Sequence, residues 1–290
     1  MKKLRLLVLL CVAGSLAFNG CKKGDGDPEV EVEAGGGITT PGGKTCTLTK
    51  QSEEGGTYYE TYEYDSQNRV VKVKEYDGNV LDDYTTISYG SSQIVVKDFE
   101  GTATQADETT TYNVSNGMVT GYTETETYTN TGGFVETYAS TYTFEHNSEG
   151  YLTKSKQVST QSSTEPGSIT NTYTYETTFT YSNGNLVSEV ESYGSGDVST
   201  TTYEYYADIK NTLVLDDNLL ISKPNKNAVK KATRSTVYQG QTGSTSVTNY
   251  TYVVNSDKLI TKSTRVEVDS FPGQSSQTHT EIMNYEYSCK

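Results

Sequence analysis

A tyrosine pair separated by one residue recurs along most of the chain. It occurs at Tyr62/Tyr64, Tyr173/Tyr175, Tyr203/Tyr205, Tyr250/Tyr252 and Tyr285/Tyr287, with Tyr142/Phe144 and Phe179/Tyr181 as close variants. Residues two apart in a β-strand point to the same side, so each pair places two rings on one face. A polar turn and a second alternating run follow most pairs, as in TYEYDSQNRVVKVKEYDG at 61–78. This order of strand, turn and strand is the pattern of a β-hairpin.

Residues 45–290 read as a single antiparallel β domain. Thr, Tyr and Val dominate between the turns, and no segment shows the apolar period of a helix. Hairpins that follow one another along the chain are expected to be neighbours in space, which predicts an all-β meander of about a dozen strands. Such a meander forms either a water-soluble up-and-down barrel or a strongly curved sheet. A lipid-facing barrel is not expected, because TETETYTNT at 123–131 has no aliphatic residue to face lipid.

The hydrophobic layer of this domain has to come largely from tyrosine. The chain contains 25 Tyr and no Trp, and its hydrophobic residues make up only 33% of the sequence. A tyrosine ring buries a large area while its hydroxyl stays at a wet edge, which suits a thin core. We expect Tyr, Val and Leu on one face of the sheet, and Thr, Ser, Glu and Lys on the other.

The N-terminus predicts export and lipid anchoring. Residues 1–20 combine basic residues with a short apolar run, the pattern of a signal peptide. Gly20-Cys21 resembles a lipoprotein cleavage box, so Cys21 is the expected site of lipidation, with palmitate among the acyl groups. An ordinary signal peptide with an incidental cysteine is the alternative. Residues 21–44 are charged and Gly-rich, which predicts a flexible tether to the membrane.

Two further cysteines lie near the ends of the β domain. Cys46 belongs to its first expected strand and Cys289 to its last. The compartment outside the inner membrane is oxidising, so we predict a Cys46–Cys289 disulfide that favours closure of the sheet. Two separate buried thiols are the alternative.

The sequence offers little for catalysis or metal binding. His146 and His279 lie in different hairpins, and no cluster has the spacing of a zinc site. Carboxylates are abundant, but the linear sequence selects no catalytic pair among them. We therefore expect a non-enzymatic protein without metal or cofactor. The formal net charge of −14 argues against nucleic acid as a partner.

One basic segment departs from this acidic background. Its residues are Lys223, Lys226, Lys230, Lys231 and Arg234. They could contact an anionic partner such as a phosphate or an acidic glycan. Alternatively, the segment is a solvated excursion whose cations pair with nearby carboxylates.

Two resemblances place the chain among envelope proteins. YEYDSQNRV at 62–70 resembles a YD (RHS-type) repeat, with Asn68 at the usual Gly position. More broadly, the tyrosine hairpins, YSNGNLVSEV at 181–190 and ISKPNKNAVKKATRS at 221–235 resemble uncharacterised Bacteroides-type lipoproteins with a porin-like β fold. This resemblance implies a lipid-anchored outer-membrane protein. KKGDGD at 22–27 resembles the acidic motifs of surface-exposed lipoproteins of such bacteria, which implies the cell surface rather than the periplasmic face.

The function expected from the sequence is a non-catalytic, monomeric envelope protein that acts as a binding or structural module. Its only expected membrane contact is the N-terminal lipid. One alternative is a glycan-binding accessory protein of polysaccharide uptake, and another is a carrier of a lipophilic ligand. An exposed row of tyrosines would favour the glycan, whereas a pocket lined by Leu and Val would favour the lipophilic ligand.

Overall fold

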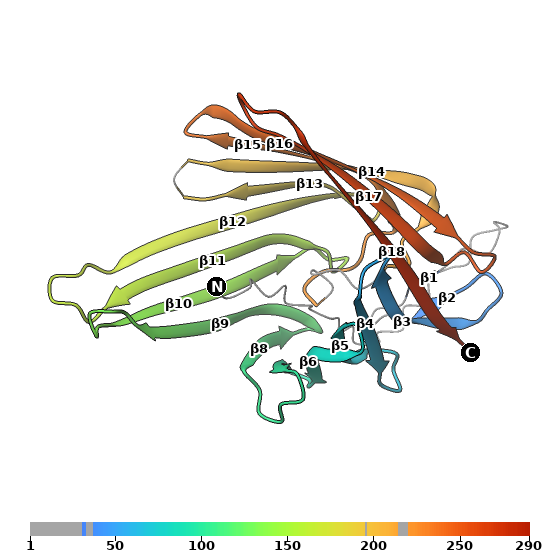
Figure 1. Ribbon diagram of the computed structural model, residues 1–290, viewed down its shortest axis with the longest axis horizontal. Helices are drawn as coiled ribbons and strands as arrows, with labels where there is room; N and C mark the ends of the chain where they lie inside the picture. Colours follow the sequence, from blue (N-terminus) through green and yellow to red (C-terminus); the bar gives the residue numbers. More distant parts are fainter. Residues whose placement is uncertain (1–30, 33–36, 195, 214–219) are drawn as a thin grey trace.

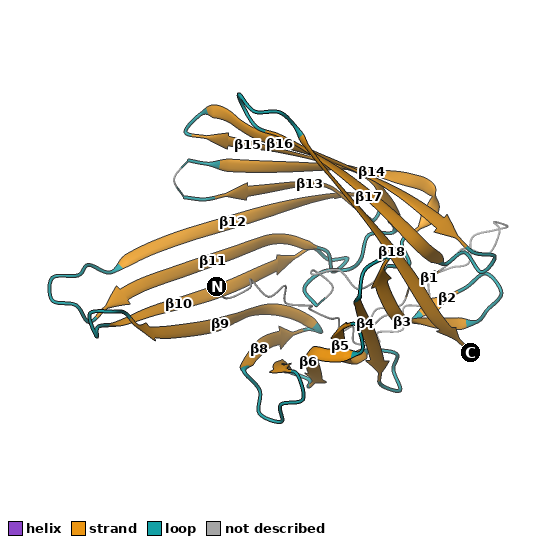
Figure 2. Cartoon of the chain, in the orientation of Figure 1, coloured by secondary structure: helices purple, strands orange, loops and turns teal. Residues whose placement is uncertain are grey.

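The computed structural model describes residues 31–32, 37–194, 196–213 and 220–290. Over these ranges the chain consists of β-strands joined by turns and loops (Figure 2). The described residues include no helix of the length and apolarity needed to cross a membrane. The signal peptide and Cys21 lie outside the described residues.

The strands follow one another along the chain, and the connection from β14 to β15 is the longest between barrel strands. Their bounds are β1 Glu31–Val32, β2 Ile38–Thr39, β3 Thr45–Glu53, β4 Tyr58–Tyr64, β5 Val70–Asp77, β6 Val80–Tyr89, β7 Gln93–Glu100, β8 Glu108–Ser115, β9 Met118–Thr129, β10 Val135–His146, β11 Leu152–Ser163, β12 Asn171–Ser182, β13 Asn185–Ser192, β14 Val198–Lys210, β15 Asn227–Tyr238, β16 Gln241–Val254, β17 Ile260–Ser270 and β18 Gln277–Cys289.

Strands β3 to β18 form a closed barrel (Figure 1). Each strand pairs antiparallel with the next, and β18 returns to pair with β3, from Met283 opposite Glu53 to Cys289 opposite Cys46. The predicted antiparallel meander is confirmed, and of its two forms the structure is the closed barrel. The described part of the barrel has sixteen strands rather than about a dozen, because segments without a tyrosine pair, such as β7 and β8, form hairpins too.

A side-chain cap explains several of the turns. The Asp65 side chain accepts hydrogen bonds from the amides of Gln67 and Arg69, at 2.8 and 2.9 Å. Asn147 makes the same two contacts in the β10–β11 turn. Asn68, at the position where the YD repeat has Gly, has a φ of 58°, which Asn tolerates better than most residues. Hydrogen bonds between residues close together in the sequence therefore stabilise these turns.

The tyrosine pairs face the inside of the barrel. Phe144 on β10 and Tyr285 on β18 pack against the same apolar cluster, although their strands lie on different sides of the barrel. They can meet only across the interior. The cross-strand register places the other tyrosine pairs on this same face. The prediction that the rings gather on one side of the sheet therefore agrees with the structure.

Apolar residues fill one end of the barrel. They flank the turns that follow β4, β6 and β8, and the buried members of the cluster are Leu48, Tyr62, Val70, Val73, Ile87, Ile94, Val96, Tyr112, Val119 and Leu220. The connection from β14 to β15 contributes to this plug: Leu220 belongs to it, and Ile221 packs against it. Hydrogen bonds from the Leu152 amide to Ser222 Oγ and from the Leu186 amide to Asn225 Oδ1 hold the connection against the wall.

A short strand before β3 also pairs with the barrel. Ile38 and Thr39 form β2, which pairs with the start of β3. Ile38 is fully buried against Cys46 and Leu259, so a single apolar side chain anchors this segment.

Candidate functional site

Beyond the plug, the inner wall carries carboxylates among the tyrosines. The inward-facing acidic residues, assigned from the cross-strand register, include Glu53, Glu60, Glu75, Asp83, Asp98, Glu108, Glu124, Glu126, Glu136, Glu189, Glu191, Glu267, Asp269 and Glu281. The expectation that Glu lies with Lys on the opposite face from Tyr is therefore wrong for these residues. Several of them accept hydrogen bonds from tyrosine hydroxyls, as Glu124 does from Tyr142 and Glu136 does from Tyr128, and together these carboxylates make the interior polar.

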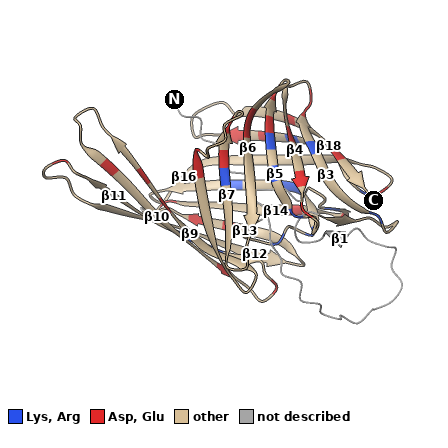
Figure 3. Ribbon diagram, turned by 90° about the horizontal axis from the view of Figure 1, so that it is seen from below, with Lys and Arg blue, Asp and Glu red and all other residues tan. Residues whose placement is uncertain are grey.

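The outer wall has a different composition. Lysines lie there in cross-strand ion pairs, including Lys74–Glu63 at 2.5 Å, Lys154–Glu176 at 2.8 Å and Lys231–Glu204 at 3.6 Å. Figure 3 shows charged residues of both signs along the strands. Threonines occupy many of the positions between them. In the described strands, this wall shows no continuous apolar band.

A buried carboxylate organises the wall formed by β3, β4 and β5. Glu60 accepts hydrogen bonds from the hydroxyls of Tyr58 and Tyr62, both at 2.5 Å, and from Gln51 Nε2 at 2.9 Å. Glu75 lies opposite Glu60 on β5. Burial raises the pKa of Glu75 to about 7, and repulsion from Glu60 and Asp83 adds to this shift.

The raised pKa of Glu75 predicts a pH-dependent stability. The folded protein holds this proton between about pH 4.5 and about pH 7, whereas the unfolded chain has released it. The free energy of unfolding therefore falls as the pH rises through this window, and the cost is fully present above it. Because the side chain is partly exposed, we expect Glu75→Gln to stabilise the protein by only about 1 kcal/mol at pH 8 and not at pH 4. Urea unfolding at both pH values measures this, and equal effects would contradict it.

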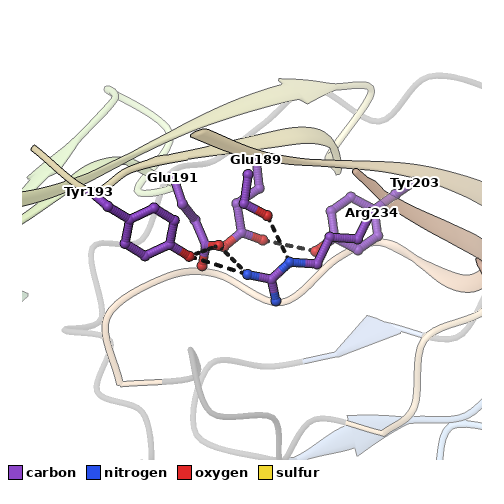
Figure 4. A network of polar contacts seen from close by, with 6 residues as sticks. Glu189, Glu191, Tyr193, Tyr203 and Arg234 are labelled. Carbon is purple, nitrogen blue, oxygen red and sulfur yellow. Dashed lines mark hydrogen bonds and ion pairs between the residues drawn. The ribbon is translucent and has the colours of Figure 1, made fainter. Parts of the chain in front are cut away.

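A second network lies on the opposite part of the wall, over β13, β14 and β15 (Figure 4). The Arg234 guanidinium donates to Glu191 at 2.5 Å, to Ser199 Oγ at 2.7 Å and to the Tyr193 hydroxyl at 3.3 Å. Tyr193 in turn donates to Glu191 at 2.7 Å. Strand alternation explains the arrangement, since Glu191 and Tyr193 are two apart and share a face.

Glu189 completes this network. It accepts a hydrogen bond from the Tyr203 hydroxyl at 2.9 Å. Burial raises the pKa of Glu189, and the charge of Glu191 adds to the effect, whereas Tyr203 and Arg234 oppose it. The same burial and the Glu189 charge raise the pKa of the Tyr203 hydroxyl, which stays a hydrogen-bond donor.

The network borders a recess in the wall with a volume of about 190 Å³. Its lining consists of Glu189, Glu191, Thr201, Tyr203, Ala232, Arg234, Ser246, Thr248 and Glu267. The cross-strand register places these residues side by side on five adjacent strands, β13 to β17. The small side chains of Thr201, Ala232 and Thr248 lie between larger neighbours and leave the space.

A row of tyrosines lines the inner face of β9 to β12, whose far ends project beyond the rest of the barrel in Figure 1. The Tyr128 and Tyr138 rings stack at 5.7 Å, and Gln161 donates to the Tyr138 hydroxyl at 2.6 Å. Tyr128, Tyr173 and Tyr175 face inward, yet 48%, 45% and 37% of their surfaces are exposed. This part of the lumen is therefore open to solvent. Below, Tyr128, Tyr138, Tyr173 and Tyr175 are called the tyrosine row.

The structure places the two cysteines of the β domain together. A disulfide joins Cys46 and Cys289, which are opposite each other in the β3–β18 pair. It therefore lies at the seam where the last strand closes on the first.

The five basic residues do not form one surface. Arg234 faces the lumen, whereas Lys231 pairs with Glu204 on the outer wall. Lys223 lies near the Tyr151 ring, 5.7 Å from its centre. Lys230 is exposed, and Lys226 lies at the end of the β14–β15 connection. The pairing of Lys231 and Arg234 with carboxylates fits the alternative interpretation, in which nearby acidic groups balance the cations.

The two histidines are separate as well. His146 ends β10 and contacts the Ile221 carbonyl through Nε2 at 2.5 Å, which ties it to the plug rather than to solvent. His279 is exposed on β18, opposite Glu267. In the described part of the chain, no group of three or more His, Cys, Asp or Glu has the geometry of a metal site.

No protein-family model and no curated protein matches this sequence significantly. Among solved structures, a porin-like protein from Bacteroides uniformis aligns with a TM-score of 0.50 and 18% identity, over 84% of this chain and 92% of that chain. The chain shares the fold of that porin-like protein. A porin-like protein from Bacteroides vulgatus aligns at a TM-score of 0.49 and 12% identity, over 83% and 98% of the two chains. At these identities the likeness concerns the fold alone.

The recess and the tyrosine row were not predicted from the sequence. A signal for each is nevertheless present, since Glu189, Glu191 and Tyr193 are spaced by two, as are Tyr173 and Tyr175. Such spacing predicts that residues share a face, but it does not predict which strands will be neighbours across the sheet.

Proposed function

We propose that this chain is a non-catalytic, lipid-anchored envelope protein whose barrel lumen binds a glycan. The observation that carries the proposal is the tyrosine row, in which aromatic rings are exposed although they face inward. A ring that only filled a core would be covered by its neighbours. Rings exposed in a concave polar wall offer a surface for an extended ligand with both apolar faces and hydroxyl groups.

The neighbours of the tyrosine row suit such a ligand. Sugar rings have apolar C–H faces that pack on aromatic side chains and equatorial hydroxyls that need hydrogen-bond partners. Gln161 lies beside Tyr138 on the inner wall, and Glu136 accepts from Tyr128 at 2.6 Å. Amide and carboxylate groups of this kind can bind hydroxyls at the edges of a stacked sugar. The combination therefore favours a glycan over a purely structural role.

A lipophilic ligand is the weaker candidate. The main cluster of buried apolar residues is packed in the plug, where Leu220 and Ile221 of the β14–β15 connection also lie. The recess beyond the plug is lined by carboxylates, Arg234 and hydroxyls. Transfer of an apolar ligand to such a wall would leave these polar groups without water or hydrogen-bond partners, which is costly.

The envelope location rests on the leader, on Cys21 and on the resemblance to Bacteroides-type lipoproteins. A polar outer wall is consistent with a barrel that stands in water and is tied to the membrane by its N-terminal lipid. The cell surface is the proposed side, because a glycan from outside the cell would reach the lumen there. Protease treatment of intact cells tests this, since an internal location would protect the chain.

A glycan-array screen of the full-length, detergent-solubilised protein tests the proposed function. We expect binding to at least one polysaccharide, and we expect the double variant Tyr128→Ala/Tyr173→Ala to bind it about ten-fold more weakly, because two stacking surfaces are lost. Tyr59→Ala/Tyr76→Ala is the matched control: this pair stacks at 4.6 Å on the outer wall, and its loss should leave affinity unchanged. Absence of binding across neutral, acidic and basic glycans would reject the function.

A further inference from the structure

We infer that the recess over β13 to β17 is a subsite that holds one uncharged sugar residue of the bound glycan. The inference rests on the proposed function and adds the position and the ligand class. The recess is a distinct hollow in the wall, and its lining supplies hydrogen-bond donors and acceptors from five strands.

The volume of the recess suits a single ring. At about 190 Å³ it is smaller than the roughly 300–1,000 Å³ of pockets that hold drug-sized molecules. Its space exists because Ala232, Thr201 and Thr248 are small, while Tyr203 and Arg234 rise beside them. The Tyr203 ring adds an apolar surface to this otherwise polar lining.

The arginines around the recess are already paired within the wall. Arg234 pairs with Glu191 at 2.5 Å. Arg265 pairs with Glu267 at 2.5 Å and lies 3.6 Å from Glu281. Glu189 is held by the Tyr203 hydroxyl. Three carboxylates and one guanidinium line the recess, so its lining carries a net negative charge, and Arg234 and the nearby Arg265 are already paired.

This arrangement, in which the carboxylates and the arginines already have partners, favours an uncharged ligand. A sugar hydroxyl both donates and accepts, so it can bridge a carboxylate and the guanidinium without disturbing their pair. A uronate would bring a negative charge close to Glu189, Glu191 and Glu267, and an ammonium group would compete with the two arginines for their partners. The uronate would gain no free cation, and the ammonium group would have to compete for carboxylates that already accept hydrogen bonds from Tyr203, Arg234 and Arg265.

The recess is connected to the tyrosine row. Tyr175 of the row contacts Tyr193 edge-to-face, with ring centres 6.1 Å apart. The hydroxyl of Tyr193 accepts the hydrogen bond from Arg234 at the border of the recess. An extended glycan lying along the row could therefore continue over Tyr193 and place one residue in the recess.

Isothermal titration of the full-length protein with defined hexasaccharides tests the inference. The probes are hexamers of mannose, xylose and glucose, together with galacturonic acid and deacetylated chitosan hexamers as the charged counterparts. We expect an uncharged hexamer to bind more tightly than both charged ones. Ala232→Phe fills the recess and should weaken that hexamer at least ten-fold. Thr233→Phe is the control and should leave affinity unchanged, because it adds a phenyl ring at the next residue, whose side chain lies on the outer face.

A milder variant guards against misfolding of Ala232→Phe. Thr201→Val removes one hydroxyl from the recess while keeping its shape, and we expect it to weaken binding about three-fold. Unchanged affinity in both recess variants, with binding lost in Tyr128→Ala/Tyr173→Ala, would overturn the subsite and leave the proposed function standing. Tightest binding of a charged hexamer would also overturn the subsite. If no glycan bound to the wild-type protein, both proposals would fail.

Discussion

The double substitution Cys46→Ala/Cys289→Ala is expected to lower the free energy of unfolding by about 3–5 kcal/mol. The disulfide links residues 243 positions apart, so it restricts nearly the whole β domain in the unfolded state. Chain entropy for so long a loop gives about 5 kcal/mol, and residual structure in the unfolded chain reduces that figure. Alanine is the better replacement, because Cys46 is fully buried and a serine hydroxyl there would need a partner.

Loss of the disulfide should also loosen the barrel seam. The β18–β3 pair has a register irregularity between Glu286 and Tyr287, and β3 pairs with β4 only from Lys50 to Ser52. In the double variant we therefore expect faster amide exchange in β3 and β18 than in strands far from the seam, such as β10 and β11. Urea unfolding with and without reductant measures the stability, and reductant should not affect the double variant. A non-reducing thiol count that found both cysteines free in the wild type would contradict the prediction.

Gly121→Ala is expected to destabilise the protein by on the order of 2–4 kcal/mol. Gly121 lies in β9 with a φ of 152°, and an added Cβ would stand 2.1 Å from the Tyr142 carbonyl oxygen on β10. Backbone atoms cannot move aside as a flexible side chain can. The β9–β10 ladder would have to separate at the point where the Tyr122 and Tyr142 rings stack at 4.2 Å.

The glycine has a reason in the fold. The β8–β9 register shifts between Asn113 and Val114, and both Val119 and Tyr122 contact the apolar cluster although they are three residues apart. A regular strand would turn one of them outward. Glycine therefore allows the irregularity that brings both side chains inside.

Gly133→Ala is the matched control for this prediction. Gly133 lies in the neighbouring β9–β10 turn at a φ of 81°, and an added Cβ there would meet no atom within 4 Å. Only the backbone preference is lost, at about 1 kcal/mol. Thermal and urea unfolding of the two variants compare the costs. Equal losses would mean that the close approach to Tyr142 does not matter.

The hairpins could be predicted because their signals are local. Alternation in β4 and β5 and the turn at 65–69 place Asp65, Asn68 and Arg69 in roles that depend only on nearby backbone. The strand number was underestimated because β7 and β8 lack a tyrosine pair, so the most visible signal is missing there. The seam disulfide was expected from the positions of its cysteines near the ends of the domain.

The candidate site could not be predicted in the same way. Arg234 meets Glu191 from 43 positions away, and the recess needs residues from five strands. These residues come together only because each pair of neighbouring strands from β13 to β17 has a particular register. A shift by one residue would send the Arg234 side chain to the outer wall, away from Glu191.

The amino-acid sequence by itself determined the all-β class, the order of the hairpins and the sharing of one face by the tyrosine pairs, since each depends on residues close together in the chain. Only the tertiary structure decided that this face turns inward together with many carboxylates. Closure of β18 on β3 makes one face of the sheet concave and the other convex. Packing of the plug requires the face that carries the tyrosine rings to lie inside. The Tyr and Glu side chains of separate strands therefore line one polar lumen.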